Sequence, residues 1–305
     1  MDDYKGLSII IPAYNEESSI AQVLNELVAC FTQAEIIVVD DGSTDKTLQI
    51  IKGAIKQSPQ IQLLQHRYNR GYGSALKTGM LKSSNEYIAW FDSDGEMNVE
   101  DLKAMYQKIL STNTAAVIGK RNRQSPSTIT RRVGKTFIRG LAYALNIKGS
   151  YDLNCGLRIF RSEVIKKYLS ILPNQFSASM TSTILLLERG YPIEFYPVKM
   201  GRRIGTSTVR IKDGFQAAVK VLQLITLFAP IRLYFVPGLF ILIMGVIYGS
   251  WVTFSEGTGF PTAGILATLT GFMCCVLGLI ADHVSHLRLD GMDLNAVIIE
   301  KINSK

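Results

Sequence analysis

Three acidic residues, Asp92, Asp94 and Glu96, follow one another at two-residue intervals. The residues that lead into them, Tyr87–Asp92, form a short apolar run typical of a buried strand, so we expect Asp92 and Asp94 at the end of that strand. Carboxylate oxygens suit hard cations such as Mg²⁺ and Mn²⁺, which commonly bridge a protein to the phosphate groups of a substrate. Because surface turns also produce Asp-x-Asp triplets, the meaning of this one depends on its surroundings.

A second acidic cluster begins with Asp40 and Asp41, at the end of another apolar run. Gly42 is typical of a turn, and Ser43 or Thr44 is predicted to cap the helix that follows. This capping leaves the two aspartates unexplained. Carboxylates in such a position can accept hydrogen bonds from a ribose hydroxyl or a base edge, as the acid after the second strand does in dinucleotide-binding folds.

A glycine-rich turn, Gly71-Tyr72-Gly73-Ser74, precedes a helical pattern. Its backbone N–H groups could approach a phosphate. The turn lacks the spacing of the well-known phosphate-binding loops, however, so simple turn formation is the favoured interpretation. Among the histidines, His66 has no evident partner, and His283 and His286 are interpreted as residues of a membrane interface.

Short apolar runs recur along the first part of the chain and alternate with stretches of helical periodicity. The runs are Leu7–Ile11, Glu35–Asp40, Ile61–Gln65, Tyr87–Asp92 and Ala115–Gly119, and the helical stretches include Ser18–Cys30 and Thr44–Lys56. This alternation predicts an α/β fold with a mostly parallel sheet covered by helices on both faces.

Polar residues gather just after the predicted strands. The clusters are Tyr14–Glu17, Asp40–Ser43, Asp92–Asp94 and Lys120–Arg121. In an open α/β sheet, ligands bind in the crevice beyond the carboxyl ends of the strands. Four polar clusters at one edge therefore predict a ligand site there, and they favour the metal interpretation of Asp92 and Asp94.

The formal net charge of the chain is +8. Basic residues are concentrated in two stretches of the sequence. Residues 120–139 hold seven basic residues and no acidic one, and residues 199–212 hold five. Arginine suits phosphate because its guanidinium donates two parallel hydrogen bonds. We therefore expect partners with phosphate groups or acidic lipid headgroups, and no nucleic-acid partner.

Two uncharged runs near the carboxyl terminus, Leu233–Phe254 and Thr262–Ala281, contain 22 and 20 residues. Each is long enough to cross a hydrocarbon core of about 30 Å. An amphipathic stretch before them, residues 213–230, is predicted to lie on the membrane surface. The loop between the runs has no Lys or Arg, whereas Arg232 and Arg288 flank the pair, so the positive-inside rule puts both ends in the cytosol.

These observations predict four parts: a globular domain (1–212), an interfacial helix (213–230), two transmembrane helices (231–284) and a cytosolic tail (285–305). Four cysteines are too few for a disulfide framework in a chain of 305 residues. The start of the sequence, Met1-Asp2-Asp3-Tyr4, is not typical of a signal peptide. We therefore expect the globular domain to face a reducing cytosol.

Six segments together resemble signatures of the family 2 inverting glycosyltransferases of the GT-A fold. The resemblance is specifically to the polyprenyl-phosphate sugar transferases related to dolichol-phosphate mannose synthase, and it covers residues 6–210. The segments are Pro12-Ala13-Tyr14-Asn15-Glu16-Glu17, Asp40-Asp41-Gly42-Ser43, Gly71-Tyr72-Gly73-Ser74-Ala75, Asp92-Ser93-Asp94-Gly95-Glu96, Cys155-Gly156-Leu157-Arg158 and Arg203-Ile204-Gly205-Thr206-Ser207. Many members of that family carry a pair of transmembrane helices after such a domain.

The resemblance implies a role for each matching position. The nucleotide pocket would be lined by Pro12, Tyr14, Glu16 and Asp40 or Asp41. Asp92 would reach the nucleotide and help to hold the metal, Asp94 would be a direct metal ligand, and Glu96 would lie close enough to join them. The pyrophosphate or the acceptor phosphate would be met by Arg121, Arg131 or Arg132, Arg202 or Arg203, and Ser207.

Three positions depart from the mannose-transferring relatives. Glu96 stands where glutamine is frequent, and Thr208 stands where a lysine commonly follows the serine. Residues 176–182 lack an acidic residue that the mannose synthases have there. The resemblance is therefore closer to other lipid-phosphate sugar transferases, and it assigns neither the sugar nor the nucleotide.

The expected reaction is inverting transfer of a sugar from a UDP- or GDP-sugar to a polyprenyl phosphate, such as dolichyl or undecaprenyl phosphate. Mg²⁺ or Mn²⁺ with Asp94, Arg121 and Arg203 would stabilise the leaving diphosphate, and an acceptor phosphate is already ionised at neutral pH. Two alternatives stay open. A transferase acting on a saccharide or lipid hydroxyl would need a base among Asp94, Glu96 and Asp152, whereas a non-catalytic membrane scaffold would need none. The oligomeric state is open too, a homo-oligomer included.

Overall fold

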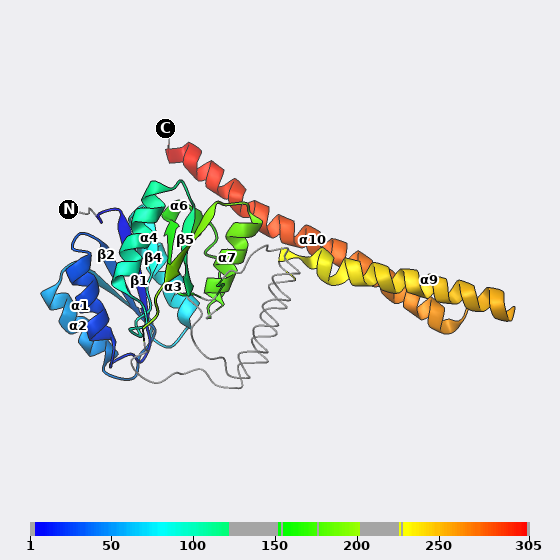
Figure 1. The fold of residues 1–305 in the computed structure, drawn as a ribbon, viewed down its shortest axis with the longest axis horizontal. Helices are drawn as coiled ribbons and strands as arrows, with labels where there is room; N and C mark the ends of the chain where they lie inside the picture. The colour runs from blue at the N-terminus through cyan, green and yellow to red at the C-terminus, as the bar shows by residue number, and fades with distance from the viewer. Residues whose placement is uncertain are drawn as a thin grey trace. The chain divides into compact units, whose positions relative to one another are not determined.

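A computed structural model of the chain describes residues 4–121, 152–153, 155–175, 177–201, 226 and 228–303. The chain divides into two compact units, and each is described by itself. The sheet unit contains strands β1–β7 and the helices that cover them, and the hairpin unit contains two long helices (Figure 1).

The sheet unit is built on a sheet with seven strands in the described residues. They are β1 (Leu7–Ala13), β2 (Glu35–Asp40), β3 (Ile61–Gln65), β4 (Tyr87–Trp90), β5 (Ala116–Arg121), β6 (Arg158–Arg161) and β7 (Ile193–Val198). Their spatial order is β3-β2-β1-β4-β6-β5-β7. Strand β6 runs antiparallel to β4 and β5, and the other pairs are parallel. The predicted mostly parallel sheet is confirmed.

Strand β1 is buried along its whole length because helices cover both faces of the sheet. Ile9 and Ile11 pack with α1, α2 and α4 on one face, and Ile10 packs with α3, α6 and α7 on the other. The helices are α1 (Ile20–Cys30), α2 (Thr47–Gln57), α3 (Tyr72–Lys82), α4 (Val99–Ser111), α6 (Ser162–Lys167) and α7 (Ala178–Glu188). Alternate residues of one strand thus belong to two separate cores.

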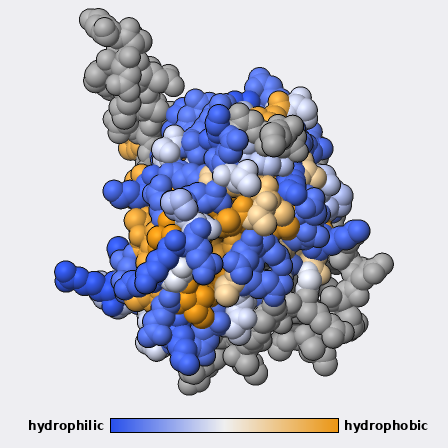
Figure 2. All heavy atoms as spheres, turned by 90° about the vertical axis from the view of Figure 1, so that its left-hand side faces the viewer, coloured by the Kyte–Doolittle hydropathy of each residue, from blue (hydrophilic) through white to orange (hydrophobic). Residues whose placement is uncertain are grey.

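Helices α1 and α2 turn their apolar residues toward the sheet. Val23 and Leu27 of α1 and Ile51 of α2 are among the buried residues, whereas the exposed positions include Gln22, Glu26 and Lys52. Figure 2 views the molecule from the side on which these helices lie in Figure 1, and hydrophilic side chains cover most of that face. The amphipathic periodicity of the sequence predicted both helices, within three residues at each end.

A glycine in α3 allows the helix to pack closely on the sheet. A Cβ atom at Gly79 would lie 2.3 Å from Cγ2 of Ile10, whereas a Cβ atom at Gly53 of α2 would meet nothing within 4 Å. We expect Gly79→Ala to destabilise the domain by about 1–3 kcal/mol through overpacking, and Gly53→Ala to stabilise it by about 0.5–1 kcal/mol. Thermal unfolding of the purified variants measures both, and an equal shift for the two would contradict the packing argument.

The hairpin unit consists of α9 (Val236–Glu256), preceded by a π-helical turn at Ile231–Phe235, and α10 (Thr262–Asn303). Glycines let the two helices approach closely. A Cβ atom at Gly271 would lie 2.4 Å from the backbone nitrogen of Leu242, and one at Gly245 would lie 2.7 Å from that of Thr268. Large apolar side chains such as Trp251 and Phe254 point outward and are exposed.

Two helical segments of the described residues, Ile231–Glu256 and Thr262–Leu287, are long and apolar enough to cross a membrane. They contain the two predicted spans, Leu233–Phe254 and Thr262–Ala281. The second helix continues beyond its apolar part to Asn303, within the predicted tail. The predicted interfacial helix, residues 213–230, lies almost wholly outside the described residues.

Candidate active site

The ends of three strands meet at the point where the order of strands reverses. From β1 the chain adds β2 and β3 on one side and then β4 on the other, which opens a crevice beyond the carboxyl ends. Two hydrogen bonds tie these ends together. The Ser93 hydroxyl donates to the Pro12 carbonyl at 2.8 Å, and the Asp41 N–H donates to the Ala13 carbonyl at 2.8 Å. The polar segments predicted to share one edge are therefore neighbours.

The aspartates of the Asp92-Ser93-Asp94 segment are held in different ways. The Tyr72 hydroxyl donates to Oδ1 of Asp92 at 2.8 Å. Burial, and then the Asp92 carboxylate, hold the pKa of Tyr72 well above its ordinary value, so the phenol keeps its proton and remains a donor. Oδ1 of Asp94 accepts the backbone N–H of Glu96 at 3.0 Å, which closes a tight turn after the strand.

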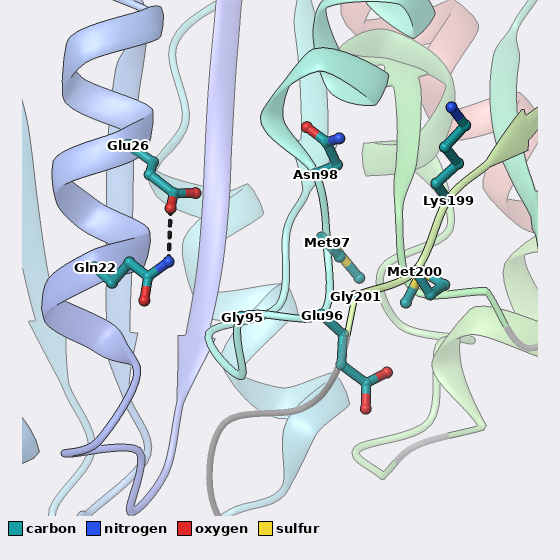
Figure 3. Close-up of a pocket in the computed structure, with 9 residues that line it drawn as sticks. All are labelled: Gln22, Glu26, Gly95, Glu96, Met97, Asn98, Lys199, Met200 and Gly201. Carbon is teal, nitrogen blue, oxygen red and sulfur yellow. Dashed lines mark hydrogen bonds between the residues drawn. The ribbon is translucent and has the colours of Figure 1, made fainter.

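That turn directs Glu96 into a shallow hollow of about 300 Å³ beside the aspartates. The hollow is lined by Gln22, Glu26, Gly95, Glu96, Met97, Asn98, Lys199, Met200 and Gly201. Figure 3 shows the Glu96 carboxylate extending away from Met97 and Asn98, and the Gln22 amide bonded to Glu26 on α1. The Gly201 N–H donates to the Glu96 carbonyl at 2.7 Å, which fixes the segment after β7 to the turn.

The metal site predicted from three carboxylates is not preformed as such. In the part of the chain that the structure describes, no three His, Cys, Asp or Glu side chains come together as a metal-binding group. The side chains of Asp92, Asp94 and Glu96 therefore do not form such a group together. Mg²⁺ in nucleotide sites commonly uses one or two carboxylates and completes its shell with phosphates and water. Asp92 and Asp94 fit a metal of that kind, which remains a prediction.

Asp40, the last residue of β2, carries an unsatisfied acceptor. Its side chain is fully buried, Oδ1 accepts the Ser43 N–H at 3.3 Å, and Oδ2 is buried without a hydrogen-bond partner. Buried polar atoms nearly always have partners, so an orphaned carboxylate oxygen at a strand end indicates a place for a ligand donor. A base N–H or a ribose hydroxyl has the required chemistry.

Asp41 is instead committed to internal bonds. Oδ1 lies 2.6 Å from Nδ1 of His66 and accepts the Arg70 N–H at 2.9 Å, and Oδ2 accepts the Gly71 N–H at 2.8 Å. The other ring nitrogen of His66 lies 2.9 Å from the Thr78 hydroxyl. The aspartate therefore organises the turn before α3, and His66, for which the sequence indicated no partner, has two.

The predicted cap of α2 is wrong. The helix begins at Thr47, and neither Ser43 nor Thr44 bonds its first turn. The Ser43 hydroxyl accepts the Asn15 N–H at 3.1 Å, and the Thr44 N–H donates to the Asn15 side chain at 2.8 Å. These bonds hold the loop after β1 against the loop after β2. The Glu16 N–H adds a bond to the Thr47 hydroxyl at 2.8 Å. Tyr14, in the loop after β1, is partly exposed beside the crevice.

The glycine-rich turn serves packing, in agreement with the favoured interpretation. Gly71 has a positive φ of 97°, and a Cβ atom at Gly73 would lie 2.1 Å from the Pro173 carbonyl. The N–H groups of Gly71 and Ser74 donate to Asp41 and to the Asn174 carbonyl. Two of the four backbone N–H groups of the turn are thus used within the protein.

Arg121, at the end of β5, forms a two-point ion pair with Asp152. The distances are 2.6 Å from Nε to Oδ2 and 3.0 Å from Nη2 to Oδ1. This bonding raises the pKa of Arg121 and keeps it charged. The remaining predicted phosphate contacts, Arg131, Arg132, Arg202, Arg203 and Ser207, lie outside the described residues.

Comparison with known proteins assigns the fold and the family. Residues 8–169 match the family model "Glycosyl transferase family 2". The chain belongs to this family. Residues 229–287, which contain both apolar helices, match the model "GtrB C-terminal hairpin". The predicted family and the predicted GT-A domain followed by a helical hairpin are confirmed.

Several relatives of this family 2 protein are lipid-phosphate sugar transferases. A dolichyl-phosphate β-glucosyltransferase of Trichomonas vaginalis is 31% identical over 52% of the chain, and the match spans 54% of that relative. A UDP-N-acetylglucosamine–dolichyl-phosphate N-acetylglucosaminyltransferase of Methanococcus voltae is 30% identical over 59% of the chain and 77% of the relative. An undecaprenyl-phosphate 4-deoxy-4-formamido-L-arabinose transferase of Photorhabdus laumondii is 24% identical over 99% of the chain and 95% of the relative.

Solved structures share the family 2 fold. Glucosyl-3-phosphoglycerate synthase from Mycobacterium tuberculosis, in complex with Mn²⁺, UDP and phosphoglyceric acid, superimposes with a TM-score of 0.56 at 18% identity. The match covers 72% of this chain and 76% of the synthase. At this identity the likeness establishes the fold alone.

Sequence reasoning missed the importance of Tyr72 and Arg158 in this family 2 site. Arg158 is fully buried, and its guanidinium donates to the carbonyls of Leu153 and Cys155 and to two hydroxyls of α7. Burial lowers the pKa of Arg158 to about 10, despite nearby groups that include Asp92. The signal that could have found Arg158 is its place at the start of a short strand, directly before the apolar residues Ile159 and Phe160.

Proposed function

We propose that this protein transfers a sugar from a nucleoside-diphosphate sugar to a polyprenyl phosphate at a membrane. One observation carries the proposal: a family 2 domain with an aspartate pair at its strand crevice is joined in one chain to a hairpin of two apolar helices. The relatives that match act, by their names, on dolichyl or undecaprenyl phosphate. A lipid acceptor explains why one chain needs both parts.

The donor would bind in the crevice above β1, β2 and β4. The orphaned Asp40 oxygen would accept a base N–H or a ribose hydroxyl, with Pro12, Tyr14 and Glu16 around it. A Mg²⁺ or Mn²⁺ ion held by Asp92 and Asp94 would neutralise the diphosphate. The Methanococcus relative uses a UDP-sugar by its name, and a fold neighbour contains UDP with Mn²⁺, which supports a UDP-sugar here before a GDP-sugar.

The acceptor phosphate would attack the anomeric carbon directly. A bond forms between a phosphate oxygen and that carbon, the bond from the carbon to the diphosphate oxygen breaks, and the configuration inverts. Because the acceptor is already an anion, the protein has to position it and stabilise the leaving group. Partly exposed Arg121 would contact a phosphate, together with Arg131 or Arg132, Arg202 or Arg203, and Ser207.

The membrane arrangement follows from the acceptor. Residues 1–212 would form the catalytic domain, 213–230 would lie along the membrane surface, and the hairpin would cross the bilayer twice. The loop between the helices has no Lys or Arg, so both ends of the hairpin, the catalytic domain and the tail would be cytosolic. The phosphate of a polyprenyl lipid lies at headgroup level, within reach of a domain tethered there.

Transfer to a hydroxyl is the second candidate, and the local bonding disfavours it. A hydroxyl acceptor needs a base to remove its proton. Asp152 is paired with the Arg121 guanidinium, and Asp94 accepts a backbone N–H. Both carboxylates therefore already accept hydrogen bonds from groups of the protein.

The purified full chain in detergent tests the proposal. It would be mixed with Mn²⁺ or Mg²⁺, a panel of UDP- and GDP-sugars, and either a polyprenyl phosphate or the matching polyprenol. We expect nucleotide release that requires one donor, the metal and the phosphate form of the lipid, and that stops when a chelator is added. Equal release with the polyprenol would favour the hydroxyl-acceptor alternative, and no release with any donor would contradict enzymatic activity.

A further inference from the structure

The carboxylate of Asp92 is contacted on both oxygens by residues far away in the sequence. The Tyr72 hydroxyl, from the first residue of α3, donates to Oδ1 at 2.8 Å. On the other side, a Cβ atom at Gly156 would lie 2.4 Å from Oδ2 and 2.8 Å from Cε of Met97. Only a residue without a side chain leaves room for this orientation of the carboxylate.

The tyrosine is held by the start of α3. Gly71, directly before it, donates its N–H to Asp41, and the Ser74 N–H donates to the Asn174 carbonyl at 3.1 Å. Gly73 packs against the Pro173 carbonyl, with no space for a Cβ atom. The first turn of α3 therefore cannot shift without breaking these contacts. They fix the position of the Tyr72 backbone, from which the ring extends.

The glycine is held by Arg158. In the antiparallel ladder, Arg158 is paired with Trp90, which places the preceding turn beside the end of β4. The guanidinium donates to the Cys155 carbonyl at 2.7 Å and to the Leu153 carbonyl at 2.8 Å, so it closes the turn that contains Gly156. Two rigid supports thus face Asp92 from opposite sides.

We propose that Tyr72 and Gly156 are positioning residues that fix the Asp92 carboxylate in the orientation that binds the metal and the nucleotide. This inference rests on the proposed function, because it needs a metal at Asp92. The terminal torsion of an aspartate is soft, so an unsupported carboxylate samples many orientations. Binding must then restrict that motion, which weakens affinity, whereas a supported carboxylate is already ordered.

The test measures Mn²⁺ binding in the presence of UDP, using the electron paramagnetic resonance signal of free Mn²⁺. Tyr72→Phe removes one hydroxyl and keeps the ring, and we expect about 10- to 100-fold weaker binding, as is usual when a residue supporting a metal ligand is changed. In activity assays, saturating Mn²⁺ should restore most of the lost rate, because Asp92 itself remains. Retained Mn²⁺ affinity in Tyr72→Phe, within twofold of the wild type, would overturn the proposal.

A matched control is Tyr87→Phe. Tyr87 is the first residue of β4, at the opposite end of the strand from Asp92, and its ring packs edge-on against Tyr106. This variant should bind Mn²⁺ with UDP as the wild type does. Equal weakening in both tyrosine variants would indicate a general effect on the domain and would count against a specific role for Tyr72.

Gly156→Ala supplies an independent second variant. Its added methyl group should displace the Asp92 carboxylate and weaken Mn²⁺ binding, while Gly53→Ala, whose methyl group meets open space, should leave binding unchanged. Unchanged binding in Gly156→Ala would overturn its part of the proposal. If the wild type binds Mn²⁺ neither with UDP nor with GDP, the metal-dependent function proposed above is contradicted and the positioning role falls with it.

Discussion

Replacing Asp94 by asparagine is expected to lower the rate of sugar transfer roughly 1,000-fold, equivalent to about 4 kcal/mol in activation free energy. Asparagine keeps an oxygen that can accept the Glu96 N–H, so the turn after the strand should survive. It removes the negative charge that would hold the metal. The loss should therefore appear as a higher metal requirement and a lower maximal rate, with unchanged thermal unfolding.

The measurement is nucleotide release by Asp94→Asn across a range of Mn²⁺ concentrations. Glu100→Gln is a suitable control, because Glu100 is a nearby exposed acid whose carboxylate is paired with Lys103 on the same helix. This control should behave as the wild type. If Asp94→Asn keeps more than a third of the activity at the same Mn²⁺ requirement, Asp94 is not a metal ligand.

Replacing Arg158 by methionine is expected to reduce the free energy of unfolding of the catalytic domain by about 2–4 kcal/mol. The guanidinium satisfies two backbone carbonyls and the hydroxyls of Ser182 and Thr183, all in the interior. Methionine fills much of the same volume and donates no hydrogen bond, so the two buried carbonyls lose their partner. Activity should fall as well, because the turn that contains Gly156 loses its hydrogen bonds to the guanidinium.

Arg161→Met provides the comparison for this prediction. Arg161 lies on the same strand, but its guanidinium is partly exposed and water can replace its bonds to Thr114 and Glu86. Thermal unfolding should show a clearly smaller loss for this variant. A loss of stability in Arg158→Met no greater than in Arg161→Met would show that the buried hydrogen bonds do not matter in the way described.

The strands near the amino terminus could be predicted because each signal was local. A buried, β-branched run defines β2, and a partly buried run with apolar residues defines β3, both with the predicted bounds, Glu35–Asp40 and Ile61–Gln65. Strand β4 ends at Trp90, two residues earlier than predicted, although the Phe91 N–H still donates to the Ile10 carbonyl of β1 at 3.0 Å. Strands β6 and β7 were not predicted. These two strands pair with segments that are distant in the sequence, and they do not belong to the regular βα alternation.

The site was predictable in its location and less so in its bonding. The location of Asp40, Asp92 and Asp94 could be predicted because each follows a strand, and the carboxyl ends of parallel strands lie at the same edge of a sheet. The predicted cap at Ser43 or Thr44 failed because both residues bond Asn15 of the neighbouring loop after β1 instead. Such contacts depend on tertiary structure, which a local capping pattern does not contain.

The same limit explains why the support of Asp92 was missed. Tyr72 was interpreted as part of a glycine-rich turn, since nothing in the sequence indicates that its hydroxyl reaches a carboxylate twenty residues away. His66 likewise reaches back to Asp41, at a separation of 25 residues. The first contact follows from the packing of α3 against the sheet, and the second from the pairing of β2 with β3, in which Asp40 lies opposite Gln65.

The most direct test of the account is to identify the product. The purified chain would be incubated with Mn²⁺, a polyprenyl phosphate and the radiolabelled nucleotide-sugar that supports nucleotide release, and the mixture would then be extracted with organic solvent. We expect the radiolabelled sugar in the organic phase, in a lipid whose mass equals that of the polyprenyl phosphate plus one sugar residue. Nucleotide release with all label remaining in water, as free sugar or a soluble glycoside, would contradict the account.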